Sequence, residues 1–404
     1  MEFRMARKED REQIEWLWSY CFEPKGDPFF EYYFSSVYQE EDTLVGLEAG
    51  NLQAVVHLRP YRLSVRGKTI PVAYIVGVAT HPEARRGGIG KELLASSLHV
   101  LREKGHGLTI LMPSKAGFYQ PYGWDLYCHQ QIYRLPLESL RPLTSKSLSY
   151  EFVDSVNSWE ELDKVYRSYT KGLSGYAVRS EADWKRLLGS ILAEGAYIVL
   201  AKYGEESVGY AFYRLGAPEI MVSELIYTTR EAQQALLGYL YNHRSQGESI
   251  RWNEGSRNNG YIFYPDGKSG NELLPFMMSR IVDVKAAVES IPVDSSVTGN
   301  VRISVQDPLV EWNHSVFSWH FEGGATKVED IGECSSTLPS VLSDQLALRK
   351  ADVTMDVGAL SLLLMGRLSA TELAFEGKLR GSEEMIALLD RAYPKQNTFI
   401  NEWY

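Results

Sequence analysis

The sequence predicts an α/β (α+β) protein made of three domains. Its 404 residues exceed what a single hydrophobic core ordinarily holds. Between residues 71 and 112, an apolar strand, a glycine-rich turn, a helix and a second strand follow one another, as in the core of an α/β unit. The same order of helices, hairpin, strand and helix recurs in residues 158–243.

Composition excludes several classes of protein. Hydrophobic residues make up 44% of the chain and charged residues 23%, which is typical of a soluble globular protein. The net charge is −10 without a long basic run, so we expect no nucleic-acid partner. The sequence has no apolar run of about 18 residues, so we expect no membrane span.

The chain ends and the cysteines favour the cytoplasm. Residues 1–10 are largely charged and lack the apolar core of a signal peptide. The three cysteines, Cys21, Cys128 and Cys334, are far apart, which suggests neither a disulfide framework nor a metal site. We therefore expect a cytoplasmic protein without a bound metal.

The first elements form a regular series. Residues 6–22 have the spacing of an amphipathic helix. Strand-like runs at 43–48 and 52–58 are separated by Ala49-Gly50-Asn51, which predicts a hairpin. Residues 71–80 are nearly all apolar, as expected for a strand buried on both faces.

A helix follows the glycine-rich turn at 85–90. Its apolar side chains fall on one stripe, formed by Ile89, Leu93, Leu94, Ser97, Leu98 and Leu101. Gly105 is a plausible stop for this helix. A short strand at 108–112 and a short helix at 116–121 complete the series.

The middle of the chain looks like a second copy of this plan. Helices, a hairpin, and a strand followed by a helix are predicted at 158–170, 180–192, 196–201, 208–213, 221–227 and 230–243. The strand passes through Thr228-Thr229-Arg230 into the helix without a glycine-rich turn. We therefore expect a repeat of the fold without a cofactor site.

The pattern of predicted strands and helices changes again near residue 280. Residues 281–288 fit a strand or a helix, and strands are predicted at 301–306 and 315–321, with helices at 359–364 and 383–392. No motif with chemistry falls here, which suggests an accessory α+β domain. The predicted domains are 1–145, 146–285 and 286–404.

The turn Arg85-Arg86-Gly87-Gly88-Ile89-Gly90 has the form of a pyrophosphate-binding loop. Its glycines let the backbone approach a ligand, and the helix that follows directs free N–H groups toward an anion. The alternative is an ordinary tight turn with two solvated arginines. The turn lacks the third glycine of a dinucleotide loop and the Gly-Lys-Ser/Thr of a Walker loop.

The strand, turn and helix resemble motif A of the GNAT (GCN5-related N-acetyltransferase) superfamily, whose Arg/Gln-x-x-Gly-x-Gly/Ala pattern the turn matches. The resemblance implies acetyl-CoA as co-substrate, with the pantetheine arm paired to the strand end and the pyrophosphate held by residues 86–91. The implied cofactor-binding residues are Val78, Ala79, Thr80, Arg85, Arg86, Gly87, Gly88, Ile89, Gly90, Lys91, Ser114 and Lys115.

The segment Gly117 to Trp124 (GFYQPYGW) resembles the family's Phe-Tyr-x-x-x-Gly-Phe segment. The resemblance implies that Tyr119 is the general acid that protonates the leaving thiolate. A phenol with a pKa of about 10 is protonated at neutral pH and can act as a donor. Tyr122 is the nearest rival, and a purely structural tyrosine in an aromatic turn is the alternative.

The whole-chain plan is similar to that of the Eis (enhanced intracellular survival) family: an active acetyltransferase domain, an inactive copy and a domain similar to sterol carrier proteins. This resemblance implies that the terminal carboxylate of Tyr404 is the general base. A terminal carboxyl has a reference pKa of about 3.3–3.7, so it is a weak base unless burial raises its pKa. A tail that merely docks by its aromatic residues is the alternative.

The same resemblance implies a primary amine on a cationic substrate such as an aminoglycoside, a polyamine or a lysine side chain, and a hexameric assembly. Glu23, Asp27 and Glu31 could line the pocket for such a substrate or be ordinary surface charges. Two other functions remain open. One is a CoA-binding scaffold without catalysis, and the other is a lipid or hydrophobic-ligand carrier that acts through the C-terminal domain.

Overall fold

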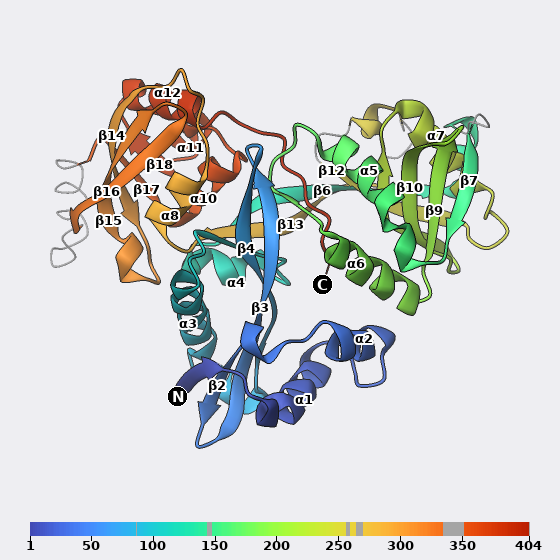
Figure 1. Ribbon diagram of the computed structural model, residues 1–404, viewed down its shortest axis with the longest axis horizontal. Helices are drawn as coiled ribbons and strands as arrows, with labels where there is room; N and C mark the ends of the chain where they lie inside the picture. Colours follow the sequence, from blue (N-terminus) through green and yellow to red (C-terminus); the bar gives the residue numbers. More distant parts are fainter. Residues whose placement is uncertain (86, 144–147, 256–258, 264–269, 334–350, 404) are drawn as a thin grey trace.

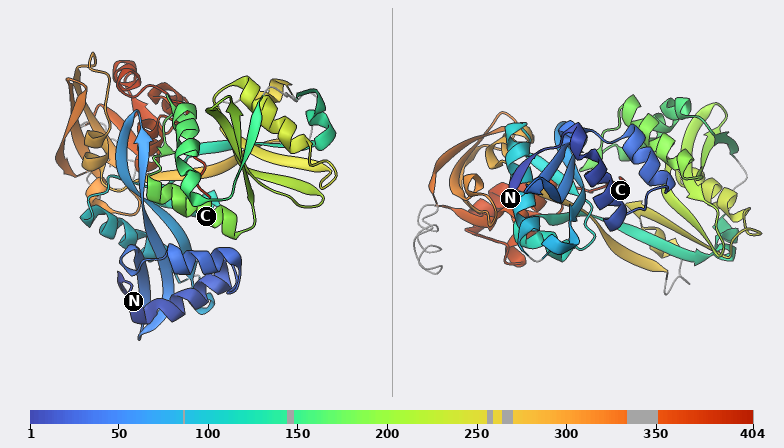
Figure 2. Two further views of the ribbon diagram at one scale, coloured as in Figure 1. Left: turned by 45° about the vertical axis from the view of Figure 1, so that its right-hand side comes forward. Right: turned by 90° about the horizontal axis from the view of Figure 1, so that it is seen from below.

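The computed structural model describes residues 1–85, 87–143, 148–255, 259–263, 270–333 and 351–403. Three lobes surround a set of long central strands (Figure 1). Both views in Figure 2 show the C-terminal unit and the second α/β unit on opposite sides of the strands of the N-terminal unit. The two α/β units therefore meet along the middle of the molecule.

The N-terminal unit follows the predicted series closely. Its elements are β1 (Glu2–Met5), α1 (Arg11–Cys21), α2 (Pro28–Ser36), β2 (Thr43–Glu48), β3 (Asn51–Val65), β4 (Lys68–Thr80), α3 (Ile89–Glu103), β5 (Leu108–Leu111), α4 (Ala116–Tyr119) and β6 (Asp125–Pro136). The predicted helices, hairpin and buried strand are confirmed. The sequence analysis assigned neither α2 nor β6.

Local chemistry accounts for these elements. The β2–β3 hairpin turns at Ala49 and Gly50, both with positive φ (49° and 82°), which is the geometry that two-residue hairpins prefer. Asp27 caps α2 by accepting a hydrogen bond from the Phe29 amide at 2.8 Å. The predicted stripe of α3 is buried from Leu93 to Leu101.

The second α/β unit repeats the plan, as predicted. Its elements are β7 (Ser149–Val153), α5 (Trp159–Thr170), β8 (Tyr176–Ala177), α6 (Glu181–Ala193), β9 (Tyr197–Tyr203), β10 (Glu206–Arg214), β11 (Glu219–Tyr227), α7 (Arg230–Tyr241), β12 (Ser249–Gly255) and β13 (Asn271–Ile281). The side chain of Thr229 caps α7 by accepting a hydrogen bond from the Ala232 amide.

One sheet joins the two units. In the described residues its 13 strands include the path β1-β2-β3-β4-β5-β13-β6-β12-β11-β10-β9-β7. The last strand of each unit crosses over: β13 pairs with β5 of the first unit, and β6 pairs with β12 of the second. The predicted boundary near residue 145 therefore does not divide the sheet, because strands from both sides of it alternate in the same sheet. The predicted boundary near residue 285 follows the last strand of that sheet.

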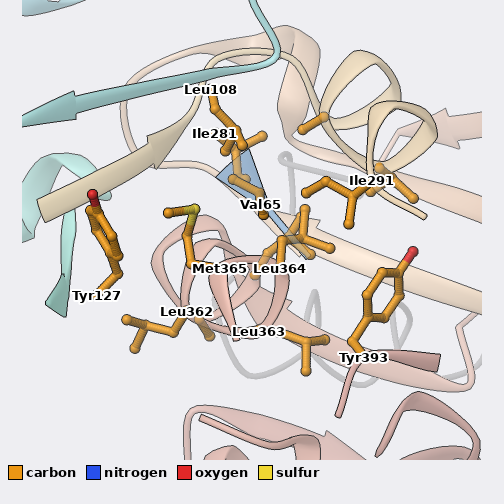
Figure 3. Close-up of a cluster of buried hydrophobic side chains, with 14 of the residues drawn as sticks. Val65, Leu108, Tyr127, Ile281, Ile291, Leu362, Leu363, Leu364, Met365 and Tyr393 are labelled. Atoms are coloured by element: carbon orange, nitrogen blue, oxygen red, sulfur yellow. The ribbon is translucent and has the colours of Figure 1, made fainter. Parts of the chain in front are cut away.

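The C-terminal unit packs helices on a second sheet of order β16-β15-β14-β17-β18. Its elements are α8 (Val284–Ser290), β14 (Gly299–Gln306), β15 (Ser315–Glu322), β16 (Ala325–Glu333), β17 (Val353–Asp356), α10 (Val357–Met365), α11 (Ala370–Phe375), β18 (Leu379–Gly381) and α12 (Glu383–Ala392). Every residue of α10 is buried, and Figure 3 shows its side chains among those of neighbouring elements. The described part of this unit contributes many buried side chains to one apolar core.

A buried ion pair joins the C-terminal unit to the rest. Arg280 on β13 donates to both carboxylate oxygens of Asp307 at 2.7 and 2.8 Å, and both side chains are fully buried. The same guanidinium donates to the Tyr122 carbonyl at 3.0 Å. The segment that follows α4 is thereby fixed to the C-terminal unit.

Candidate active site

The strand β4, which carries the predicted cofactor residues Val78 to Thr80, extends beyond its neighbour β5. β4 and β5 are parallel and paired from Ala73↔Thr109 to Ile75↔Leu111, and β5 then ends while β4 continues to Thr80. On its other edge, β4 remains paired with β3 up to Thr80. The main-chain groups that follow Ile75 therefore lie beyond the β5 ladder and can pair with an extended ligand.

A bulge shapes this strand end. The β3–β4 register shifts between Val55 and His57, opposite Gly77, which has φ = 60°. A Cβ at Gly77 would lie only 2.5 Å from the Trp18 ring and 2.9 Å from the His57 ring. Glycine is required here because both the dihedral angle and the space exclude a side chain.

The glycine-rich turn leads directly into α3. Gly88 caps the helix with φ = 85°, and no atom lies within 4 Å of the position that its Cβ would occupy. The first amides of a helix lack intrahelical acceptors, and Gly88 has no side chain to satisfy them. The Lys91 amide already donates to the Gly88 carbonyl at 2.9 Å, so an anion at this turn would meet the amides that precede Lys91, such as those of Ile89 and Gly90. Arg86 lies outside the described residues.

The other predicted cofactor residues lie around this opening. The Arg85 guanidinium bends back across the strand end, where it donates to the Thr80 carbonyl at 3.1 Å and to Cys21 Sγ at 3.5 Å. Ser114 and Lys115 follow β5 and are exposed. Lys115 is the residue immediately before α4, which carries Tyr119.

Tyr119 belongs to the same cluster as the strand and the turn. Its side chain is 7% exposed and packs with Leu93, Leu94 and Trp124, while Val78 and Ile89 border that cluster. Burial raises the pKa of the Tyr119 phenol to about 12, so it keeps its proton near neutral pH. Tyr122 also borders the cluster, so position alone leaves both tyrosines as candidate donors.

Buried Cys128 is a poor nucleophile. Its side chain is 1% exposed, and burial raises the pKa of its thiol to about 12. Because the thiolate is the reactive form, this cysteine does not favour a covalent route.

A pocket of about 560 Å³, here called the central pocket, lies between the two α/β units. It is lined by residues of α2, α6, β10 and β11 together with the C-terminal tail, residues 397–403. Of the three acids that the sequence left as pocket-lining or surface charges, Glu23 and Asp27 line it. Glu31 does not: its carboxylate accepts a hydrogen bond from the Gly26 amide at 2.9 Å.

An ion triad forms part of the pocket wall. Arg179 donates to both oxygens of Glu224 at 2.8 Å and to Glu402 at 2.9 Å. Its guanidinium lies between the rings of Tyr166 and Trp184, 4.2 and 4.6 Å from their centroids. Burial opposes charge on both acids; Arg179 nevertheless holds the pKa of Glu224 low, whereas burial raises the pKa of Glu402.

The triad anchors the C-terminal tail beside the cofactor strand. The Tyr74 hydroxyl on β4 donates to the main-chain carbonyl of Glu402 at 3.0 Å. Tyr74 directly precedes Ile75, the last β4 residue paired with β5. Trp403 lies against Phe276 with centroids 4.7 Å apart. Tyr404, the predicted general base, lies outside the described residues.

In the second unit the tail occupies the corresponding gap. β11 and β12 are paired only as far as Val222↔Trp252 and then part. The Asn401 side chain bridges them: it donates to the Ser223 carbonyl at 3.0 Å and accepts from Asn253 at 2.7 Å. The Phe399 ring approaches to 3.1 Å from where a Cβ of Gly255 would lie. The tail thus occupies, between β11 and β12 of the second unit, the position that corresponds to the strand end of β4 beyond β5 in the first unit.

Sequence reasoning missed the triad, although one signal was present. Glu224 lies within the largely apolar run from Ile220 to Ile226 of β11, both of whose faces are covered: Ile220 and Val222 belong to one hydrophobic cluster and, after a register shift at Ser223, Ile226 belongs to another. Such a residue is buried only if it is paired or functional. Its partners Arg179 and Glu402 carry no comparable local signal.

Comparisons with known proteins now decide the family. An acetyltransferase (GNAT) domain model matches residues 2–127, and a second such model matches residues 175–281. The chain belongs to the GNAT acetyltransferases. A sterol carrier protein domain matches residues 284–401, which confirms the predicted plan of tandem GNAT folds followed by a sterol-carrier-like domain.

Full-length relatives share this plan. An uncharacterized N-acetyltransferase of Streptomyces avermitilis is 25% identical over 373 residues, which cover 85% of this chain and 83% of that protein. A GCN5-related N-acetyltransferase from Anabaena variabilis ATCC 29413 has a TM-score of 0.82 at 19% identity, and Eis1 from Mycobacterium abscessus has 0.71 at 19%; each alignment covers 100% of both chains. This GNAT protein is thus an N-acetyltransferase with an Eis-like fold.

The described residues contain no cluster of three or more histidine, cysteine, aspartate or glutamate side chains arranged to hold a metal ion. Within the same part of the chain, every helix is too short or too polar to span a bilayer.

Proposed function

We propose that this GNAT protein uses acetyl-CoA to acetylate a primary amine by direct attack. One observation carries the proposal: β4 continues to Thr80 beyond the end of β5, and a glycine turn then leads into the start of α3. The strand end can pair with a pantetheine arm, and helix amides with a free N-terminus suit a diphosphate. We assign the pantetheine to Val78, Ala79 and Thr80.

The remaining contacts follow from the same geometry. The diphosphate is assigned to the turn and first helical residues: Arg85, Arg86, Gly87, Gly88, Ile89, Gly90 and Lys91. Ser114 and Lys115, exposed beyond β5, complete the cofactor set. The open space above Gly88 and the position of Arg85 at the strand end support this assignment.

Two residues move protons in the proposed reaction. Acetyl-CoA supplies the acetyl group as a thioester; the amine nitrogen forms the new C–N bond as the C–S bond breaks. Tyr119 gives its proton to the leaving sulfur, with Tyr122 as the rival donor. The terminal carboxylate of Tyr404 accepts the proton of the amine, directly or through water. The path of the tail up to Trp403, along the central pocket, supports this role.

The acceptor in this proposal is a cationic amine bound in the central pocket. Six carboxylates and three guanidinium groups line that pocket, a formal excess of negative charge. Such a lining attracts a cation and repels an anion. Aminoglycosides, polyamines and lysine side chains are the classes that the family resemblance implies.

Lys91→Glu tests the cofactor assignment. Lys91 is exposed in the first turn of α3, where a glutamate favours the helix but repels a diphosphate. We expect the KM for acetyl-CoA to rise about tenfold or more, while the melting temperature is kept. Lys68→Glu, the same charge change at the start of β4, is the control. Equal KM values in both variants would contradict the assignment.

An acetyl-transfer assay with a broad amine panel separates the proposal from its rivals. A CoA-binding scaffold would bind the cofactor without turnover. A carrier acting through the C-terminal unit would bind an apolar ligand without acetylating any amine. A hexameric assembly and a cytoplasmic location remain parts of the proposal, and sedimentation and fractionation test them.

A further inference from the structure

The walls of the central pocket are largely apolar. Phe29 and Tyr32 come from α2 of the first unit, whereas Leu187 and Ile191 come from α6 of the second. The Tyr32 hydroxyl donates to the Arg186 carbonyl at 2.9 Å, which ties the two helices together. Two apolar contact surfaces from different units thus border one space.

Part of this apolar lining is still exposed. Met221 of β11 and Trp403 of the tail both line the pocket, yet they are 44% and 43% exposed. Large apolar side chains that line a concave site and stay accessible gain by contact with an apolar ligand. The pocket therefore offers apolar surface to whatever enters it.

The charged groups on the α6 side are already engaged with one another. Arg186 is paired with Asp183, and Arg214 with Glu194 at 2.7 Å. These pairs satisfy the strongest donors and acceptors on this side of the pocket. A ligand that carries many hydroxyl groups would have to compete with these pairs for hydrogen bonds.

Uncompensated negative charge is confined to two places. In the triad, two carboxylates share the single guanidinium of Arg179. The Glu23 carboxylate accepts a hydrogen bond from a neutral donor, the Trp18 indole N–H, at 2.9 Å, and the Asp27 carboxylate accepts one from the Phe29 amide. The ammonium group of a substrate is attracted to these places, while the rest of the substrate molecule contacts the apolar walls.

We infer that the preferred acceptor is a primary amine on an apolar or aromatic body, such as an alkylamine or arylalkylamine, rather than an aminosugar. This inference rests on the proposed acetyl transfer and narrows its substrate class. A buried hydroxyl left without a partner costs about tenfold in affinity, and an aminosugar carries several. An aryl or alkyl body instead gains affinity by burying its apolar surface against the walls.

A panel of four amines tests the inference on the full-length protein with acetyl-CoA. We expect kcat/KM for tryptamine and hexylamine to exceed that for kanamycin by at least tenfold, with methylamine the poorest substrate. A kcat/KM for kanamycin equal to or above that for tryptamine would overturn the inference while leaving acetyl transfer intact. If no amine is acetylated, the proposed function itself fails.

The variant Ile191→Asn tests whether the apolar wall formed by α6 binds the apolar part of the substrate. We expect kcat/KM for tryptamine to fall about tenfold, mainly through KM, and that for methylamine, which is too small to fill the pocket, to change less than threefold. Lys185→Gln, on the same helix but paired with Glu181 outside the pocket, should change neither. An equal loss for both amines in a variant with unchanged melting temperature would refute recognition by the wall.

Discussion

In the proposed reaction Tyr119 is the proton donor, and its phenol stays protonated near neutral pH. Burial raises the pKa of its phenol to about 12. We expect Tyr119→Phe to lower kcat about 100-fold, the lower range for loss of a general acid, with little change in the KM for acetyl-CoA. Steady-state kinetics measure both. Tyr122→Phe is the matched control, and a larger kcat loss there would transfer the role to Tyr122.

His57 makes the fold sensitive to acid. It is fully buried beside the Gly77 bulge, and the Tyr33 hydroxyl lies 3.0 Å from its Nδ1. Burial, with a smaller contribution from Arg59, lowers its pKa to about 3. Between that value and about 6.5, the unfolded chain binds a proton that the folded protein excludes. Stability contributed by neutral His57 is therefore lost as the pH falls through this window.

Through His57, the free energy of unfolding should fall by roughly 1.4 kcal/mol per pH unit below about pH 6, which is an upper value. Urea unfolding of the wild type and of His57→Gln at pH 7, 6 and 5 measures it. The variant should lose less free energy of unfolding on acidification than the wild type does. Parallel curves would show that another group controls the acid response.

Among the elements, the C-terminal tail is held by a buried ion triad in which Arg179 pairs with Glu224 and Glu402. Removing the Arg179 guanidinium leaves Glu224 and Glu402 buried without their cation. Loss of one member of a buried ion pair costs about 3–5 kcal/mol. We expect Arg179→Met to lower the free energy of unfolding by that order, and the double variant with Glu402→Gln to recover part of it. No recovery would mean that the tail is held mainly by Asn401 and Phe399.

The elements with a strong local pattern could be predicted from the sequence. The α3 stripe, the turn at Ala49-Gly50 and the strand before the glycine turn each follow from residues close together in the chain. The partners of β6 and β13 could not be predicted, because a strand pattern specifies which face is buried and leaves its neighbour open. The α2 helix, with bulky aromatic residues on most of its surface, has too weak a polar face for periodicity to identify.

The proposed site could be predicted only to the same limit. Apart from Ser114 and Lys115, the proposed cofactor residues lie within one contiguous strand, turn and helix, so a motif could point to them. The central pocket combines Asp27 from the first unit, Arg179 and Glu224 from the second, and Glu402 from the tail. No local pattern relates such distant residues, and the tail's position in the β11–β12 gap depends on the whole fold.

At the scale of the molecule, the exchanged strands make the two GNAT units interdependent. Residues 1–145 alone would leave β5 without β13 and β6 without either neighbour. Unpaired strand edges of this kind promote aggregation. We expect this fragment to be aggregated or unfolded by gel filtration and circular dichroism. A folded monomer that binds acetyl-CoA would contradict the interdependence.

A crystal structure with bound acetyl-CoA tests the central claim most directly. We predict diphosphate oxygens within hydrogen-bonding distance of main-chain amides between Gly87 and Lys91, and a pantetheine arm paired with residues 78–80 in the gap after Ile75. The thioester should point toward the central pocket. A cofactor bound elsewhere, or a turn that stays empty at saturating acetyl-CoA, would contradict the account.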